Sequence, residues 1–429
     1  MNMPTLSRRG FVKSVAVAGL ALQARPFFAQ VAGATRKLKV GLVGCGGRGR
    51  GAIENLLEAA PLAGVELEIL AVTDVFAASA TKAGEKFGVA AERCFSGFDG
   101  YRKVIEQPVD LVVLATPPNF RPVHFEAAVA AGKHCFIEKP VAVDPPGVRR
   151  MLAAGEVAAK KGLSVVAGAQ RRYQGNYLRN AHAVHEGAIG PILGGTVMWN
   201  QDQLWYKERL EGESDAHYLA RNWVNFLEMS GDHIVEQHFH NLDVANWFIG
   251  RTPLAAVGFG GRMRRKTGNQ YDFFSVDYDY GQGCHIHSTC RQIDGCYNRV
   301  GEFFTGAEGT VYPEGKLDST AKTPVTFKEF VTHPNGQVQE QVELLKSIVA
   351  ERPINDTRNV ADSTLTAIMG RVSAYTGQFV RWTDLTTPGA RYYDLALAPT
   401  AEDFERGEVK VPEEGVAPVP GSATKPARA

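Results

Sequence analysis

The stretch KLKVGLVGCGGRG, residues 37–49, is a short apolar run that leads directly into glycines, and RGAIENLLEAA follows with apolar residues at helical spacing. Between the predicted strand and the predicted helix the glycines have the spacing G-x-G-x-x-G. The first glycine of such a turn permits a sharp bend, the second admits a pyrophosphate, and the third lets the helix pack on the strand. The free N–H groups of the helix favour the phosphate charge. The predicted cofactor loop comprises Gly44, Gly46, Gly47, Arg48 and Gly49.

The second predicted strand, LEILAVTDV at 67–75, ends on an acid. A carboxylate at this place accepts hydrogen bonds from both ribose hydroxyls of NAD. Val75 and Phe76 follow Asp74, where a basic or hydroxyl residue would favour the 2′-phosphate of NADP. We therefore expect NAD as the cofactor and NADP as the weaker candidate. The alternative is a glycine turn in a sheet protein that binds no dinucleotide.

Strand and helix patterns alternate from residue 35 to residue 167, and the strands are continuously apolar. This pattern is typical of a parallel sheet that is covered on both faces. After residue 168 the pattern changes to period-2 runs separated by glycine-containing turns, which indicates antiparallel strands. We predict an α/β protein with a doubly wound parallel Rossmann sheet at 35–167, an α+β domain with a large, mostly antiparallel open sheet at 168–398, and a loose tail at 399–429.

The composition restricts the class of partner. The 429 residues include 47 Lys and Arg against 46 Asp and Glu, so no basic field favours nucleic acid. The six cysteines form no C-x-x-C pair, which argues against a zinc knuckle or a thioredoxin-like motif. Hydrophobic residues make up 44% of the chain, enough to build a large core. We expect a protein that acts on small molecules.

The N-terminus has the features of an export signal. SRRGFVK at 7–13 is a twin-arginine pattern, and the apolar run SVAVAGLAL at 14–22 follows it. We predict that residues 1–34 are a signal segment, that the twin-arginine export machinery is a partner, and that the protein is periplasmic or exported. The apolar run is too short to span a bilayer, and no later run approaches about 18 apolar residues. We therefore expect no integral membrane protein.

Two further motifs end predicted strands at the carboxyl edge of the first sheet, where ligands of such folds bind. ATPPNF lies at 115–120, and IEKP lies at 137–140. The second motif would place a lysine ammonium beside the nicotinamide, whereas a plain turn is an open alternative for the first. The predicted cofactor contacts at this edge are Thr116, Pro117, Asn119, His124, Glu138 and Lys139.

The order GCGGRG, TD, ATPPN and EKP resembles the Gfo/Idh/MocA family of sugar and polyol oxidoreductases. The resemblance covers roughly residues 37–395 and extends to the family frame D-x-G-x-H-x-x-D, which is Glu236 to Asp243 here. Two residues depart from that frame, because Glu236 stands at the usual Asp and His238 at the usual Gly. The resemblance implies a tightly bound NAD, a sugar or glycoside substrate and a homodimer or homotetramer.

The stretch GDHIVEQHFHNLDVANW at 231–247 has apolar residues at helical intervals. On one helix Glu236, His240 and Asp243 would share a face, and His233 would lean toward it. His238 would point elsewhere. Three interpretations compete: a polar, half-buried helix with no chemistry, a metal site built from His233, Glu236 and His240, and a proton-transfer site.

The cofactor motifs favour proton transfer, since an imidazole can accept a hydroxyl proton as hydride leaves the same carbon. The hypothesis assigns His240 as acid and base and Lys139 as the stabiliser of the developing oxyanion. Glu236 or Asp243 would fix the tautomer of the imidazole. We expect no metal at this site.

The candidate substrate-lining residues all follow the predicted domain boundary at 167/168. The segment AQRRYQGNY at 169–177 borders the substrate in similar proteins, and the aromatic-rich section at 201–226 suits a sugar. Ordinary packing is at least an equal alternative for each candidate. The predicted substrate contacts are Arg172, Tyr173, Tyr206, Asn225 and His233, with Trp205 as a further candidate.

The sequence therefore predicts an NAD-dependent oxidoreductase that transfers hydride between a sugar or polyol hydroxyl and the nicotinamide. One alternative is a redox-neutral NAD-dependent glycoside hydrolase, which oxidises, eliminates, adds water and reduces again. A second alternative is a non-catalytic protein that binds a sugar or the cofactor. The pair Lys139 and His240 argues against the second alternative.

Overall fold

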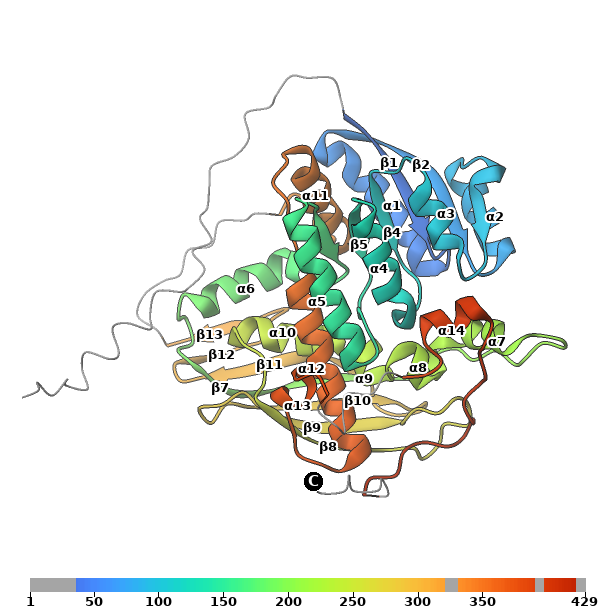
Figure 1. Ribbon diagram of the computed structural model, residues 1–429. Coiled ribbons are helices and arrows are strands. Elements are labelled where there is room, and N and C mark those ends of the chain that lie inside the picture. Colours follow the sequence, from blue (N-terminus) through green and yellow to red (C-terminus); the bar gives the residue numbers. More distant parts are fainter. Residues whose placement is uncertain (1–35, 321–330, 390–396, 422–429) are drawn as a thin grey trace, which may run out of the picture. The chain divides into compact units, whose positions relative to one another are not determined.

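A computed structural model describes residues 36–320, 331–389 and 397–421 of the chain (Figure 1). The predicted signal segment at 1–34 lies outside these residues. No helix in the described ranges combines the length and the apolar character needed to cross a membrane.

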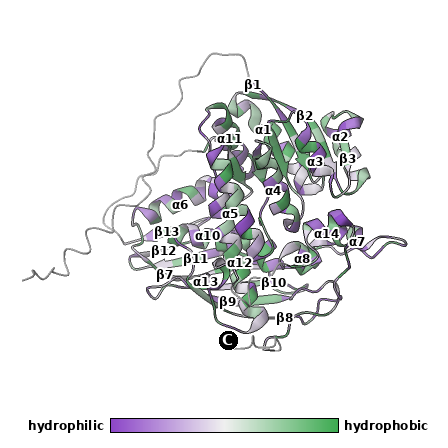
Figure 2. Ribbon diagram, viewed as in Figure 1, coloured by the Kyte–Doolittle hydropathy of each residue, from purple (hydrophilic) through white to green (hydrophobic). Residues whose placement is uncertain are grey.

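The first sheet has six strands in the order β3-β2-β1-β4-β5-β6, and all of its pairings are parallel. This is the doubly wound order of a dinucleotide-binding fold, so the predicted fold class is confirmed. Strand β4 is fully buried and β5 is buried apart from His134, as their apolar sequences require, and Figure 2 shows this apolar layer between the helices. The strands are β1 (Arg36–Val43), β2 (Val65–Asp74), β3 (Cys94–Ser96), β4 (Leu111–Leu114), β5 (His134–Ile137) and β6 (Val165–Ala167).

Helices cover both faces of this sheet. One face packs on α3 (Gly100–Glu106), α4 (Arg121–Ala130) and α5 (Pro145–Lys160), and the edge beyond β2 packs on α2 (Ala77–Phe87). The other face packs on α1 (Gly47–Ala63) and on α11 (Gly336–Val349), which comes from the far end of the chain. The predicted boundary at 167/168 therefore separates the two sheets but not the helices that cover them.

The second sheet has eight strands in the order β13-β12-β11-β7-β10-β9-β8-β14, and only β7 and β10 pair in parallel. Helices α10 (Phe239–Ile249) and α12 (Thr357–Thr376) pack on its inner face. The predicted open, mostly antiparallel sheet is confirmed. The strands are β7 (Ile192–Gln201), β8 (Ala255–Gly261), β9 (Phe273–Asp279), β10 (His285–Gln292), β11 (Arg299–Gly306), β12 (Gly309–Val311), β13 (Leu317–Ser319) and β14 (Val380–Arg381).

The remaining helical segments are short. They are η1 (Ala91–Arg93), η2 (Pro118–Phe120), η3 (Gln170–Tyr173), α6 (Gly175–His185), α7 (Asp215–Arg221), η4 (Trp223–Asn225), α8 (Leu227–Ser230), α9 (His233–Glu236), α13 (Trp382–Thr386) and α14 (Ala401–Arg406).

The stretch at 231–247 is not the single helix that its spacing predicts. It forms α9 and α10, which are separated at Gln237 and His238. The N–H of His238 bonds to the carbonyl of His233, one residue farther back than in an α-helix, and the N–H of Asn241 bonds to His238. The residues before and after this break therefore do not follow one helical face.

The tail after residue 398 is packed rather than loose over the described residues. Phe404 of α14 is buried and contacts Phe98 and Phe120, with ring centroids 5.0 Å and 4.9 Å away. Glu402 forms an ion pair of 2.9 Å with Arg150 of α5. The composition of the tail, which is rich in Pro and Glu, concealed this buried aromatic anchor.

Candidate active site

The glycine loop between β1 and α1 forms an open cradle. Gly44 has a φ of +97°, and an added Cβ would lie 2.8 Å from the backbone of Thr116. At Gly49 an added Cβ would lie 1.8 Å from the carbonyl of Gly44, which explains the close approach of α1. Gly46 and Gly47 meet nothing within 4 Å, so side chains there would fill the cleft. The loop thus leaves room for a pyrophosphate beside the N-terminus of α1.

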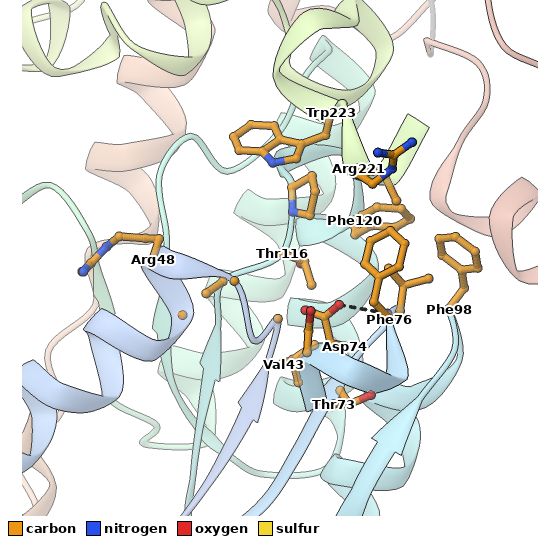
Figure 3. Close-up of a pocket in the computed structure, with 18 of the residues that line it drawn as sticks. Val43, Arg48, Thr73, Asp74, Phe76, Phe98, Thr116, Phe120, Arg221 and Trp223 are labelled. Carbon is orange, nitrogen blue, oxygen red and sulfur yellow. Dashed lines mark hydrogen bonds between the residues drawn. The ribbon is translucent and has the colours of Figure 1, made fainter. Parts of the chain in front are cut away.

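Asp74 lies beside this loop at the end of β2. Its carboxylate accepts hydrogen bonds from the backbone N–H groups of Cys45 (2.7 Å) and Phe76 (3.0 Å), and Figure 3 shows the second of these. Burial raises the pKa of Asp74, and these two hydrogen bonds oppose that effect. The carboxylate is held at the edge of the cleft, where it can accept the ribose hydroxyls of NAD.

The cleft has a volume of about 730 Å³ and both domains line it. Phe76 and Phe98 form the wall on the side of the first sheet, and Arg221 and Trp223 face them from the second domain (Figure 3). Trp205, a predicted substrate contact, also lines this cleft. The aromatic-rich section at 201–226 therefore covers the half of the cleft that holds Asp74. The aromatic composition of this section predicts contact with a sugar substrate, whereas in the structure its residues line the predicted cofactor cleft.

The ATPPNF motif contributes only part of its predicted contacts. Thr116, Pro117 and His124 line the cleft, and the Thr116 hydroxyl lies 3.1 Å from Nδ1 of His124. Burial lowers the pKa of His124 to about 3, so this imidazole is neutral. Asn119 instead donates hydrogen bonds to the carbonyls of Glu228 (2.7 Å) and Pro399 (2.9 Å). The predicted cofactor contact of Asn119 is thus replaced by a bond between the domains.

Lys139, at the end of β5, meets the second domain at α9. Its ammonium donates to the carbonyl oxygen of Glu236 (2.7 Å) and to Oε1 of the same residue (3.1 Å). The other carboxylate oxygen of Glu236 is buried and has no hydrogen-bond partner among the described residues. A cation and a free carboxylate oxygen therefore lie together where β5 reaches the second domain.

His240 lies in the first turn of α10 and is 6% exposed. Its ring stacks on Trp199 of β7, with centroids 5.7 Å apart. Burial holds the pKa of His240 well below its usual range, and the cations Lys139, Arg171 and Arg48 lower it further. The imidazole is therefore neutral and can accept a proton. Neither Trp199 nor Arg171 is among the site residues that the sequence predicts.

Arg48 extends from the glycine loop away from the Asp74 side of the cleft (Figure 3). Its Nε donates to Oε1 of Glu138 at 2.5 Å, and its Nη2 lies 3.9 Å from Glu340 of α11. Both oxygens of Glu340 are buried without a partner in the described structure, and burial raises the pKa of Glu340 well above its usual range. Burial thus favours the neutral form of Glu340, and the nearby Arg48 opposes this effect. Glu138, which directly precedes Lys139 in the chain, therefore contacts the glycine loop through Arg48.

Residues 38–168 match the family described as "Oxidoreductase family, NAD-binding Rossmann fold", GFO_IDH_MocA. The nucleotide-binding domain belongs to the Gfo/Idh/MocA oxidoreductases. This family assignment accounts for three features of the domain: the Rossmann strand order, the glycine cradle and the position of Asp74.

Curated relatives and solved structures extend the likeness beyond this domain. An inositol 2-dehydrogenase of Ralstonia nicotianae is 29% identical over 255 residues, which cover 58% of this chain and 66% of the relative's own length. A levoglucosan dehydrogenase in complex with NADH and levoglucosan has a TM-score of 0.61 at 18% identity, over 81% of this chain and 99% of that chain. An aldose-aldose oxidoreductase of Caulobacter crescentus has a TM-score of 0.59 at 18% identity, over 81% and 100%. These two structures share the fold.

Asp243, the last residue of the Gfo/Idh/MocA frame, has a different role from the predicted one. Its carboxylate accepts two hydrogen bonds from Nε of Arg172 (2.9 and 3.1 Å), one from Nη2 (2.8 Å) and one from the hydroxyl of Ser363 (2.7 Å). These bonds tie α10 to η3 and α12, so Asp243 does not orient the imidazole of His240. The reason is that Arg172 and Ser363 occupy the carboxylate, although Asp243 and His240 lie three residues apart on the same helix.

The other predicted substrate contacts are also occupied by protein groups. Tyr173 donates to Asp356 (2.6 Å), the Tyr206 hydroxyl lies 3.0 Å from that of Tyr218, and the Asn225 amide donates to the Trp205 carbonyl (2.9 Å). These bonds connect structural elements, so Tyr173, Tyr206 and Asn225 each have a structural role, and their predicted contact with the substrate stays a prediction. Arg172 is likewise engaged with Asp243.

The histidines that flank the site belong to the core. His233 is buried against Phe274, with ring centroids 5.1 Å apart, and burial lowers its pKa well below the usual range. His238 lies 2.7 Å from the hydroxyl of Ser288, and burial lowers its pKa to about 3. The metal hypothesis required His233, Glu236 and His240 to converge, but they contact different partners. Within the described ranges, no three His, Cys, Asp or Glu side chains are grouped as a metal site requires.

Proposed function

We propose that this protein is a dehydrogenase that moves hydride from a secondary hydroxyl carbon of a sugar or polyol to NAD. The observation that carries the proposal is the convergence of Lys139, Glu236 and His240 at the end of β5. The open glycine cradle and Asp74 support NAD at the neighbouring edge of the same sheet. The names of the relatives, an inositol 2-dehydrogenase and a levoglucosan dehydrogenase, support a polyhydroxylated substrate.

In this proposal His240, Lys139 and Glu236 each have a separate role in the reaction. When bound, NAD supplies the hydride acceptor. His240 is neutral and takes the proton of the substrate hydroxyl, while the Lys139 ammonium stabilises the negative charge that develops on that oxygen. The unpartnered oxygen of Glu236 is available to accept a bond from a neighbouring hydroxyl. Glu236 thus positions both the ammonium and the substrate.

The activity test uses the purified protein with added NAD, a panel of sugars and polyols that includes myo-inositol and D-glucose, and aryl glycosides. The proposal expects NADH to accumulate with at least one polyol. Release of the aryl alcohol without net NADH would instead establish the redox-neutral hydrolase. A protein that binds NAD but turns over no compound would establish the non-catalytic alternative.

Retention of the cofactor is a further part of the proposal, because the second domain covers the adenosine half of the cleft. We expect NAD(H) rather than NADP(H) to be released when the purified protein is denatured. Trp223→Ala should weaken the affinity for NAD about ten- to a hundred-fold, as expected for the loss of an aromatic surface that stacks on a base. Calorimetric titration with NAD measures this. The control Phe379→Ala removes an exposed aromatic ring outside the cleft and should leave the affinity unchanged; equal affinities in all three proteins would remove Trp223 from the site.

Export by the twin-arginine route and assembly as a homodimer or homotetramer are proposals that rest on the N-terminal sequence and on the family resemblance.

A further inference from the structure

The cations around His240 are each paired with a carboxylate of the protein itself. Lys139 pairs with Glu236 at 3.1 Å, Arg171 pairs with Glu302, and Arg48 pairs with Glu138 at 2.5 Å. A fourth pair, Arg172 with Asp243 at 2.8 Å, lies one turn farther along α10. Each of the three cations that lower the pKa of His240 is thus paired with an acid of the protein.

In each of these pairs the cation is the more exposed partner. The side chain of Arg171 is 12% exposed against 1% for Glu302, and that of Arg48 is 35% exposed against 6% for Glu138. The acids are therefore the more deeply buried partners, most clearly Glu302 and Glu138. A ligand that reaches these cations would also meet the charge of the acids paired with them.

Glu302 shows most clearly that this arrangement is built into the fold. It comes from β11, and its carboxylate accepts hydrogen bonds from Arg171, from the amide of Asn241 (2.6 Å) and from the hydroxyl of Tyr177 (3.2 Å). Arg171 also lies over the indole of Trp199, the ring that stacks on His240, with its guanidinium carbon 5.7 Å from the centroid. Without Glu302, an unpaired guanidinium would lie next to the proposed base.

We propose that the site selects uncharged sugars and polyols against uronates and sugar phosphates, and that Glu302 is a specificity-determining residue because it neutralises Arg171. This inference rests on the proposed function and names its substrate class. A carboxylate or phosphate ligand gains binding energy from a cation that has no other counter-ion, which is why arginines free to fork onto such groups recognise them. Here a ligand anion would meet Arg171 together with the charge of Glu302, and like charges in a buried site are disfavoured.

The hydroxyl groups of an uncharged ring face no such repulsion. A hydroxyl both donates and accepts hydrogen bonds, so it can bond to a guanidinium or ammonium N–H and to an acid oxygen of the same pair. Lys139 with Glu236 offers this combination at the proposed site of proton transfer, where one acid oxygen has no partner in the described structure.

The experiment compares kcat/KM for the neutral compounds myo-inositol and D-glucose with kcat/KM for D-glucuronate and D-glucose 6-phosphate. The wild-type protein should prefer the neutral compounds. Glu302→Gln should raise the anionic-to-neutral ratio by about tenfold or more, because it frees Arg171. The double variant Arg171→Gln with Glu302→Gln should return the ratio toward that of the wild type. Glu308→Gln, an exposed residue in the turn after β11, is the matched control and should leave the ratio unchanged.

The outcomes separate this inference from the proposed function. A wild-type preference for an anionic sugar, or a ratio in Glu302→Gln within about twofold of the wild type, overturns the inference while the dehydrogenase activity stands. If none of the four compounds reduces NAD, the proposed function fails for them. The same comparison is then made by saturation-transfer NMR of each compound with the NADH-loaded protein, and stronger signals from the anions would overturn the inference. A thermal melt of each variant confirms that it is folded.

Discussion

His240→Asn is expected to lower kcat roughly 10²–10⁴-fold for the best substrate of the panel while NAD remains bound. The reason is that the neutral imidazole is the proposed acceptor of the hydroxyl proton, and the asparagine amide cannot take its place. Steady-state rates and calorimetric NAD binding measure the two effects separately. His185→Asn changes an exposed histidine of α6 and serves as the control. Full activity in His240→Asn would exclude the histidine as the base.

The pH profile of the wild-type protein gives an independent measurement of the same residue. Burial, together with the nearby cations, lowers the pKa of His240 below the ordinary value of about 6.5. A base with a lowered pKa stays unprotonated, and therefore competent, at pH values below that ordinary value. The acid limb of kcat/KM should thus lie below about pH 6.5. An acid limb above the ordinary histidine value would contradict the environment described for this ring.

Lys139→Met is expected to lower kcat roughly 10²–10³-fold, since the oxyanion would lose its stabilising cation. The acid limb of the pH profile should also move to higher pH, because the Lys139 ammonium is one of the charges that lower the pKa of His240. These two changes together distinguish a catalytic cation from a merely structural one. A loss of structure alone would lower the rate without moving the limb.

The variant Lys139→Met also leaves the carboxylate of Glu236 without its counter-ion, and an uncompensated buried charge is destabilising. The double variant Lys139→Met with Glu236→Gln removes that effect. A rate as low in the double variant as in the single one would assign the loss to the missing ammonium. Recovery of activity in the double variant would show instead that the single variant suffered from the unpaired acid.

The dinucleotide cradle was predictable because it depends on local sequence. Gly44, Gly46 and Gly49 are placed by a strand and a helix that adjoin them in the chain. Each of these positions favours glycine for a steric reason. The parallel sheet was predictable for a similar reason, since continuously apolar strands alternate with helices. Lys139 follows from a motif at the end of a predicted strand and His240 from the family frame on a predicted helix, and their proximity is what the fold implied by the resemblance predicts.

The errors concern contacts between distant segments and one break within a predicted helix. Arg171 and Arg172 are neighbours in the chain, yet Arg171 pairs with Glu302, which is 131 residues away, and Arg172 pairs with Asp243. Nothing in the local sequence RRY predicts that the two arginine side chains pair with different acids. The break at Gln237 and His238 contains neither proline nor glycine, so the helical spacing concealed it.

By itself the sequence determined the fold class and the glycine cradle, and it predicted Asp74, Lys139 and His240 as site residues, because each of these depends on neighbours in the chain or on the periodicity of apolar residues. Only the tertiary structure decided which carboxylate neutralises which cation, which aromatic residues cover the cofactor cleft and how α11 and the tail pack. Those contacts join residues far apart in the chain, and the energy of each depends on burial and distance, which no local pattern encodes.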